Sequence, residues 1–323
     1  MRVKLWGVRG SSPSPLLPSD VTERVRSVLT DFARNPAGLD VASFLEGRTR
    51  SQVSGYGGNT SCVEISSAGQ RLIIDGGTGI RVLGDELMQG PCGLGQGEVH
   101  LLFTHFHWDH LMGLPFFAPF FVQGNKVHVY SVEPDLHAVF QTLFRKPYFP
   151  VELSQLKAQI IYHQLSPRQP RQWGDLSVTP YRLDHPDPCW GFKVEQGGRA
   201  FSYCVDTECT RVSQADLGLD LPLYQGIDTM IFDAQYTPSE VGEKLNWGHA
   251  TASRGLEIAL REKMRRVIFV HHDPASSDQK IAAAESQARG DYLQKLKQLQ
   301  ESPDSPIFAV EWFFGYEGLT LEI

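Results

Sequence analysis

The chain has 323 residues, of which 41% are hydrophobic and 21% are charged, and its formal net charge is −7. This composition is ordinary for a soluble globular protein with a sizeable core, folded as one large domain or two small ones. The negative charge repels nucleic-acid backbones, so a binder of long nucleic acids would need a local basic patch. The densest group of cations, at positions 261–266, falls at the end of an expected helix, where cations complement the helix dipole. Long nucleic acid is therefore not an expected partner.

The cysteines and the first residues indicate a cytoplasmic protein. The five cysteines are scattered and lack CxxC spacing, so neither a disulfide framework nor a cysteine zinc site is expected. Residues 1–10 read as a short alternating strand that ends in glycine, unlike a signal peptide with its charged start and apolar core. No apolar run reaches membrane length, so we expect no membrane partner.

One pattern recurs along the chain: a short apolar or β-branched run that ends in Gly, Asp or His. Such runs are typical of buried strands in α/β proteins, whose ends meet at an active-site edge. We therefore expect functional side chains to follow the strands. In chain order, the expected strands are residues 3–8, 62–65, 72–74, 99–103, 177–183, 201–205, 230–232 and 267–270.

Two segments between these strands have a different pattern. Residues 14–55 and residues 133–165 each contain apolar residues at helical spacing, and the second segment continues with Pro147-Tyr148-Phe149-Pro150. No repeat, low-complexity tract or linker divides the chain, so we expect a single domain over 1–323 with these two segments as insertions. Because the second segment has few cations and many aromatic residues, it suits a lid over a small ligand better than a track for a duplex.

A dense cluster of potential metal ligands follows the strand 99–103. The run HxHxDH at 105–110 places four imidazole or carboxylate groups within six residues, and such groups suit zinc, manganese or iron. Two metal ions need more ligands than this run supplies. Further candidates stand at the ends of later strands, at Asp184-His185, Asp206 and His271-His272. The sequence therefore predicts a centre with two divalent metal ions.

The order HxHxDH, His, Asp, His resembles the metallo-β-lactamase superfamily and, within it, the ribonuclease Z-like phosphodiesterase branch. Segments at 6–11, 56–61, 74–77 and 206–208 are similar to family segments and stand in the expected order, so the resemblance spans nearly the whole chain. It implies an α/β fold of the αββα type. In that fold two mixed β-sheets pack face to face, helices flank them, and the metals lie at the sheet edges.

The ligand set proposed on this basis has seven residues. One ion is held by His105, His107 and His185, the other by Asp109, His110 and a histidine of the terminal pair, with Asp206 bridging the two. His271 and His272 compete for the last position, because successive strand residues point to opposite faces. We favour His271, which falls where the family's ligand closes the last core strand. The expected ions are Zn²⁺, with Mn²⁺ or iron as alternatives.

The catalytic candidates are His249 and Asp109. Residues 248–251, Gly-His-Ala-Thr, resemble the His-x-Thr element of ribonuclease Z-like phosphodiesterases, which implies that His249 contacts the scissile phosphate or protonates the leaving group. In an alternative interpretation, Thr251 simply caps a helix. Asp109 is both a ligand and a group that could orient the attacking water. Asp75 is a candidate to hold a ligand imidazole, or else a turn carboxylate.

We predict a two-metal phosphodiesterase that hydrolyses a small phosphodiester, with 3′,5′-cyclic nucleotides as candidate substrates. A ribonuclease Z-like RNA-processing endonuclease is one alternative, and a glyoxalase II-like thioesterase is another, because a carboxylate bridge occurs there too. A periplasmic β-lactamase is disfavoured by Asp206, which stands where that group has a cysteine ligand. His107 argues against a flavodiiron oxidoreductase. The natural substrate and the oligomeric state, a homodimer included, stay open.

Overall fold

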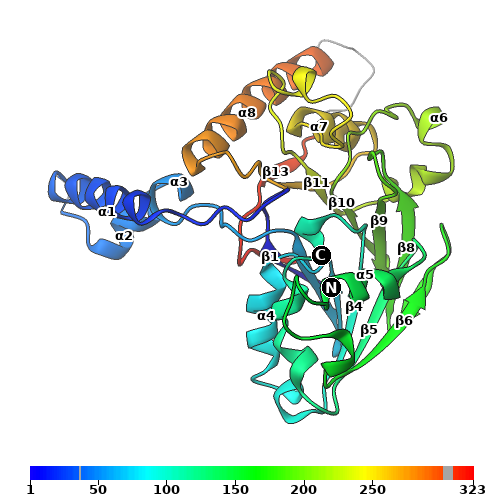
Figure 1. Ribbon diagram of the computed structural model, residues 1–323. Helices are drawn as coiled ribbons and strands as arrows, with labels where there is room; N and C mark the ends of the chain where they lie inside the picture. Colours follow the sequence, from blue (N-terminus) through cyan, green and yellow to red (C-terminus); the bar gives the residue numbers. More distant parts are fainter. Residues whose placement is uncertain (36–37, 301–307) are drawn as a thin grey trace.

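The structure is a computed structural model that describes residues 1–35, 38–300 and 308–323 (Figure 1). Its centre is a pair of seven-stranded sheets, each with antiparallel and parallel pairings. In spatial order, the first sheet contains β14 (Thr320–Glu322), β1 (Arg2–Gly7), β2 (Cys62–Ser67), β3 (Gln70–Ile74), β4 (Glu98–Leu102), β5 (Lys126–Ser131) and β6 (Gln159–Gln164). The second contains β13 (Glu311–Phe314), β12 (Arg266–Val270), β11 (Thr229–Asp233), β10 (Arg199–Cys204), β9 (Trp190–Gln196), β8 (Leu176–Arg182) and β7 (Arg171–Trp173).

The two sheets pack face to face through alternate side chains of their strands. Leu5 and Leu102 of the first sheet and Phe201 and Ile268 of the second are fully buried in this shared core. Burying one such side chain stabilises the fold by about 1.5–3 kcal/mol. The core between the sheets is therefore what holds the strand ends of both sheets at one common edge.

Helices cover the outer face of each sheet, which confirms the predicted αββα arrangement (Figure 1). Apolar side chains of α4 (Gly79–Leu87) and α5 (Leu136–Leu143) pack on the first sheet. Those of α7 (Ala252–Arg261) and α8 (Asp278–Gln300) pack on the second, with the short α6 (Gln214–Leu217) beside them. No helix in the described part of the chain is long and apolar enough to span a membrane.

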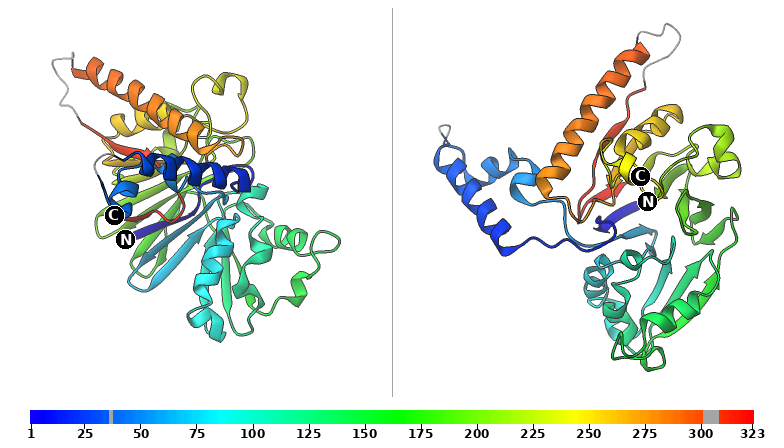
Figure 2. Two further views of the ribbon diagram at one scale, coloured as in Figure 1. Left: turned by 90° about the vertical axis from the view of Figure 1, so that its left-hand side faces the viewer. Right: turned by 45° about the horizontal axis from the view of Figure 1, so that its top comes forward.

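The described parts of the segment 14–55 form an arm that projects away from both sheets in Figure 1 and in the right-hand view of Figure 2. It consists of α1 (Pro18–Ala33), α2 (Val41–Glu46) and α3 (Arg50–Val53); residues 36 and 37 lie outside the described residues. An ion pair of 2.6 Å between Arg24 Nη2 and Asp278 Oδ2 joins the arm to the start of α8.

The segment 133–165 has two parts with different roles. Its first part contains α5, whose apolar face packs on the first sheet. Its last part is β6, which pairs in parallel with β5 along its whole length. This strand belongs to the sheet itself and is not an addition to it.

Candidate metal centre

The candidate site lies where strands of both sheets end. His105 follows β4, His185 follows β8, Asp206 follows β10 and His271 follows β12. The carboxyl ends of neighbouring parallel strands meet at one edge, which is where α/β proteins place their ligands. The packing of the two sheets therefore brings together residues that are far apart in the sequence.

Three residues just after the ends of strands have a left-handed backbone. Asp75, Asp206 and His271 have φ values of 65°, 64° and 66°, and all three are buried. Non-glycine residues seldom adopt this conformation, and it is found most often at functional sites held by their surroundings. The chain changes direction sharply at each position, so the side chain no longer follows the alternation between the two faces of the sheet.

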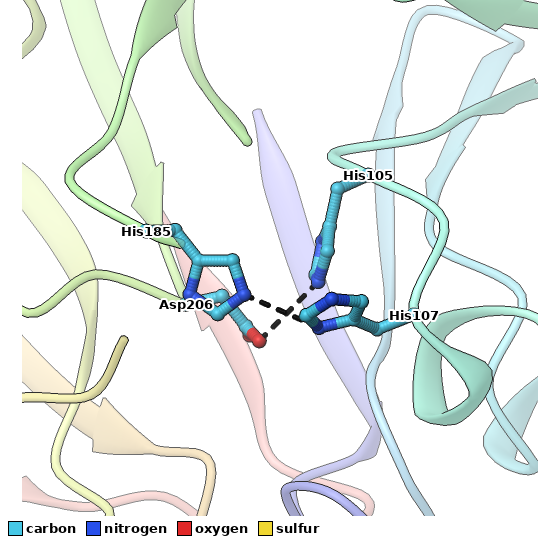
Figure 3. A group of neighbouring side chains, drawn as sticks. All are labelled: His105, His107, His185 and Asp206. Carbon is cyan, nitrogen blue, oxygen red and sulfur yellow. Dashed lines mark hydrogen bonds and ion pairs between the residues drawn. The ribbon is translucent and has the colours of Figure 1, made fainter. Parts of the chain in front are cut away.

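The first group of potential ligands comprises His105, His107, His185 and Asp206, and their ligand atoms all lie within 4.8 Å of one another. Figure 3 shows the four side chains converging, His105 and His107 from one side and His185 and Asp206 from the other. The Nε2 atom of His185 lies 3.2 Å from Nδ1 of His107, and Nε2 of His105 lies 3.5 Å from Oδ2 of Asp206. These separations suit one cation between the four side chains.

The second group comprises Asp109, His110, Asp206 and His271, whose ligand atoms again lie within 4.8 Å of one another. Oδ1 of Asp206 lies 3.1 Å from Nε2 of His110 and 3.3 Å from Nε2 of His271. Asp206 thus presents one oxygen to each group. The structure therefore brings together all seven residues proposed from the sequence.

The unpaired atoms of the two groups fit metal ions. Nε2 of His105, His110 and His271 and Oδ1 of Asp206 are buried and have no hydrogen-bond partner among the residues that the structure describes. Buried polar atoms nearly always have a partner, so four orphaned atoms that converge on two points need a ligand. Burial alone would raise the pKa of Asp206, but His271, His110 and His105 hold it well below its usual range. The carboxylate is therefore ionised, as a metal ligand must be.

The other ring nitrogen of each histidine is engaged by a neighbouring group, as is typical of metal-ligating histidines. Asp75 was the one such partner suggested by the sequence, and the structure confirms this contact. The pairs are His110 Nδ1 with Asp75 Oδ2 at 2.7 Å, His107 Nε2 with Asp187 Oδ2 at 2.8 Å, His105 Nδ1 with Thr104 Oγ1 at 3.0 Å, His185 Nδ1 with the Gly248 carbonyl at 3.1 Å, and His271 Nδ1 with Ser61 Oγ at 3.2 Å.

His249 lies against the second group, with its ring 4.9 Å from that of His271 and nearly parallel to it. Its Nδ1 donates to Oδ2 of Asp233 over 2.9 Å. Burial would lower the pKa of His249, but the Asp233 carboxylate, with Asp206 and Asp109, raises it to about 9. The contact with Asp233 therefore favours the protonated form of His249. Asp233 was not among the functional residues expected from the sequence, although this aspartate directly follows the expected strand 230–232.

Two glycines of the site are required by close packing. A Cβ atom on Gly10 would lie 2.3 Å from Cδ2 of His271. A Cβ on Gly248, which has φ +83°, would lie 2.0 Å from Nδ1 of His185. Larger residues at these positions would displace the imidazoles. Beside Gly10, the Ser11 amide donates to Oδ2 of Asp109 over 2.8 Å and fixes that carboxylate.

Three neighbouring residues have structural roles. His272 is turned away from both groups, since its Nε2 donates to the Gly315 carbonyl over 2.8 Å. Arg9 is buried and donates over 2.8 Å to the carbonyls of Gly57 and Ser276. Thr251 does cap α7, accepting from the Arg254 amide, as the alternative interpretation proposed. This cap does not account for His249, whose ring contacts Asp233.

The segment expected to act as a lid reaches the site only through α5. This helix and the residues before it line a cavity of about 590 Å³ beside His107. The aromatic residues Tyr148 and Phe149 do not line that cavity. Tyr148 is 70% exposed, and Phe149 packs against Phe144 and Phe116. An aromatic face for a ligand at 148–150 is thus not present.

Comparisons with known proteins agree with this description. The family model described as "Beta-lactamase superfamily domain" matches residues 70–272. A ribonuclease Z from Clostridium kluyveri is 25% identical over 211 residues, which cover 62% of this chain and 61% of that relative. The human tRNase Z short form has a TM-score of 0.59 at 17% identity, covering 100% of this chain and 99% of the other. Zn²⁺-bound PqqB from Methylobacterium extorquens has a TM-score of 0.62 at 16% identity, covering 100% of both chains.

Proposed function

We propose that this chain, which belongs to the β-lactamase superfamily, is a metal-dependent hydrolase that cleaves small phosphodiesters. The observation that carries the proposal is the arrangement of two ligand groups that share Asp206, with the cationic His249 beside the second group. A phosphodiester brings negative charge to this position and needs a proton for its leaving alkoxide. His249 can supply both the positive charge and the proton.

The donor set fits two divalent cations. His105, His107 and His185 would hold one, Asp109, His110 and His271 the other, and Asp206 both. Zn²⁺ suits these imidazole and carboxylate ligands, with Mn²⁺ and iron as alternatives. When bound, such a pair supplies a water of lowered pKa and positive charge for the phosphate oxygens.

The chain's own residues orient the reacting groups and move the proton. Because Asp233 engages Nδ1 of His249, Nε2 is the ring nitrogen left to donate to the leaving oxygen. The Ser11 amide holds Asp109, which orients the attacking water. Asp75 fixes the ring of His110, so that the second group keeps its geometry during turnover.

A thioesterase would need the His249–Asp233 pair less than a phosphodiesterase would. A thiol has a pKa of about 8.5, so a thiolate leaves near neutral pH without a proton donor. An alkoxide does not, and the His249–Asp233 pair therefore favours a phosphodiester over a thioester. The RNA-processing alternative is supported by the 25% identity to a ribonuclease Z. The net charge of −7 favours a small substrate over a long polyanion.

A panel of substrates tests the proposal. The purified protein, loaded with Zn²⁺ or Mn²⁺, is assayed on bis-p-nitrophenyl phosphate, cyclic mononucleotides, a precursor transfer RNA and a glutathione thioester. We expect turnover of the diesters, with cyclic nucleotides hydrolysed better than structured RNA. Efficient precursor cleavage without cyclic-nucleotide turnover would identify an RNA-processing enzyme instead. Turnover of the thioester alone would identify a thioesterase.

A further inference from the structure

The cavity of about 590 Å³ beside His107 has the size of a pocket for a small organic ligand. Its walls come from the loop after β4, from α5 with the residues before it, and from the loop after His185. It shares His107 with the first ligand group. A substrate whose phosphate lies at the ligand groups could therefore extend its organic part into this cavity.

The walls of the cavity offer flat and apolar surface. Trp108 lines it and is 63% exposed, and its indole makes no aromatic contact or hydrogen bond within the described part of the chain. Phe106 and Val139 are half-buried on neighbouring walls. An exposed indole next to a metal-binding run is a stacking surface for a planar ring, which every nucleobase offers.

The charge of the cavity is negative. Glu133, Asp135 and Asp187 line it, and no Lys or Arg is among the described residues that do so. Two of these carboxylates are engaged: Glu133 accepts from Trp190 Nε1 over 2.9 Å and lies 3.9 Å from Nη1 of Arg182, and Asp187 accepts from His107.

Asp135 is free to bind a ligand. Its carboxylate makes no hydrogen bond or ion pair within residues 38–300, and it does not cap α5 although it directly precedes that helix. Its φ of 67° is the left-handed conformation, which Asp and Asn tolerate better than most residues. A free carboxylate on this wall accepts hydrogen bonds from N–H groups and repels anions.

We propose that the cavity binds the organic part of the substrate, and that this part is a flat, uncharged heterocycle with an exocyclic amine, such as adenine, cytosine or guanine. The inference rests on the proposed function for the position of the phosphate. The ring stacks on Trp108, and the amine donates to Asp135. Uracil fits less well because it presents carbonyl oxygens where the amine would stand, and a second phosphate in the cavity is repelled by the three carboxylates.

Kinetics on matched substrates test the stacking surface. Cyclic AMP, which carries a base, is compared with 1-deoxyribose 3′,5′-cyclic phosphate, which has the same cyclic diester but no ring in place of the base. Trp108→Ala should raise KM for cyclic AMP roughly 10- to 100-fold, because base stacking on an aromatic side chain contributes on this scale. The same variant should change kcat/KM for the base-free cyclic phosphate less than about threefold, since this substrate has no planar ring to place in the cavity. Tyr148→Ala, which removes an exposed aromatic side chain outside the cavity, should leave the kinetics of both substrates unchanged.

A specificity reversal tests Asp135. Asn tolerates the left-handed backbone, so Asp135→Asn keeps the fold and replaces a pure acceptor by a group that also donates. We expect the preference for cyclic AMP over cyclic UMP, measured as the ratio of their kcat/KM values, to fall in this variant because kcat/KM for cyclic UMP rises. An unchanged preference would remove Asp135 from base recognition.

Binding of nucleosides without phosphate separates this inference from the proposed function. Calorimetry with adenosine and uridine should show adenosine binding that Trp108→Ala abolishes. If adenosine binds but no diester is hydrolysed, the pocket stands and the proposed function fails. If cyclic AMP is hydrolysed but adenosine does not bind and Trp108→Ala leaves KM unchanged, the function stands and the pocket is wrong.

Discussion

Substitution of His249 by alanine removes the cation beside the second ligand group and leaves every proposed metal ligand in place. The Asp233 carboxylate raises the pKa of His249 from its ordinary value of about 6.5 to about 9, which favours the protonated ring at neutral pH. The Asp233 contact therefore keeps a proton donor ready at neutral pH. Loss of a positioned acid or charge stabiliser lowers kcat by roughly 10² to 10⁴. We expect His249→Ala to fall in this range with its metal content unchanged.

The leaving group and the pH profile distinguish proton donation from charge stabilisation by His249. A p-nitrophenolate departs without a proton at neutral pH, so a proton donor matters less for p-nitrophenyl esters than for alkyl diesters. The wild-type rate should fall as pH rises through the pKa of His249, which bound cations would lower from about 9, and the variant should lack this descending limb. Equal losses on both ester types would indicate phosphate binding by His249. Loss of a metal ion, or wild-type turnover on every diester, would refute a catalytic role.

Three further predictions concern the ligand groups and a distant histidine. Asp206→Ala should lower both metal occupancy and turnover because it removes the shared ligand, and metal analysis that finds two ions per chain would show that the bridge is misplaced. Asp75→Asn should weaken metal binding roughly 10- to 100-fold by releasing the ring of His110, measured by competition with a chelator; unchanged affinity would contradict this role. Burial and the neighbouring His128 lower the pKa of His100 to about 4, so the folded protein holds His100 neutral where the unfolded chain protonates it. The free energy of unfolding should therefore fall as pH drops from about 6.5 to about 4, and it should fall less in His100→Gln. Denaturant titrations at several pH values measure this. If the free energy of unfolding falls equally with pH in both proteins, His100 is excluded as the cause.

The parts of the site with a local signal could be predicted from the sequence. The HxHxDH run sets four ligands within one loop, and Asp206 and His271 follow apolar runs that end abruptly. Each of these strands formed within a few residues of its expected bounds, because a buried strand needs a continuous apolar run. Such features depend on neighbours in the sequence. One amino-acid sequence is therefore enough to predict them.

Contacts between residues far apart in the sequence could not be predicted, because no local sequence pattern marks them. Asp187 reaches His107 over 80 residues, and Ser61 reaches His271 over 210. Both contacts depend on the way the two sheets pack, which no local pattern encodes. Strands such as β6 and β7 also went unrecognised. In β6 the exposed and half-buried polar residues at an edge of the sheet hide the apolar run.

The choice between His271 and His272 shows where a local rule gives the right answer for an incomplete reason. Alternation along a strand says only that the two side chains point to opposite faces. In the structure β12 ends at Val270, and the left-handed backbone of His271 takes that residue out of the alternation. The same conformation occurs at Asp75 after β3 and at Asp206 after β10. At each of these turns the side chain either belongs to a ligand group or contacts one. The left-handed backbone at the strand ends therefore orients the side chains of the site, and the core between the sheets holds this strained conformation in place.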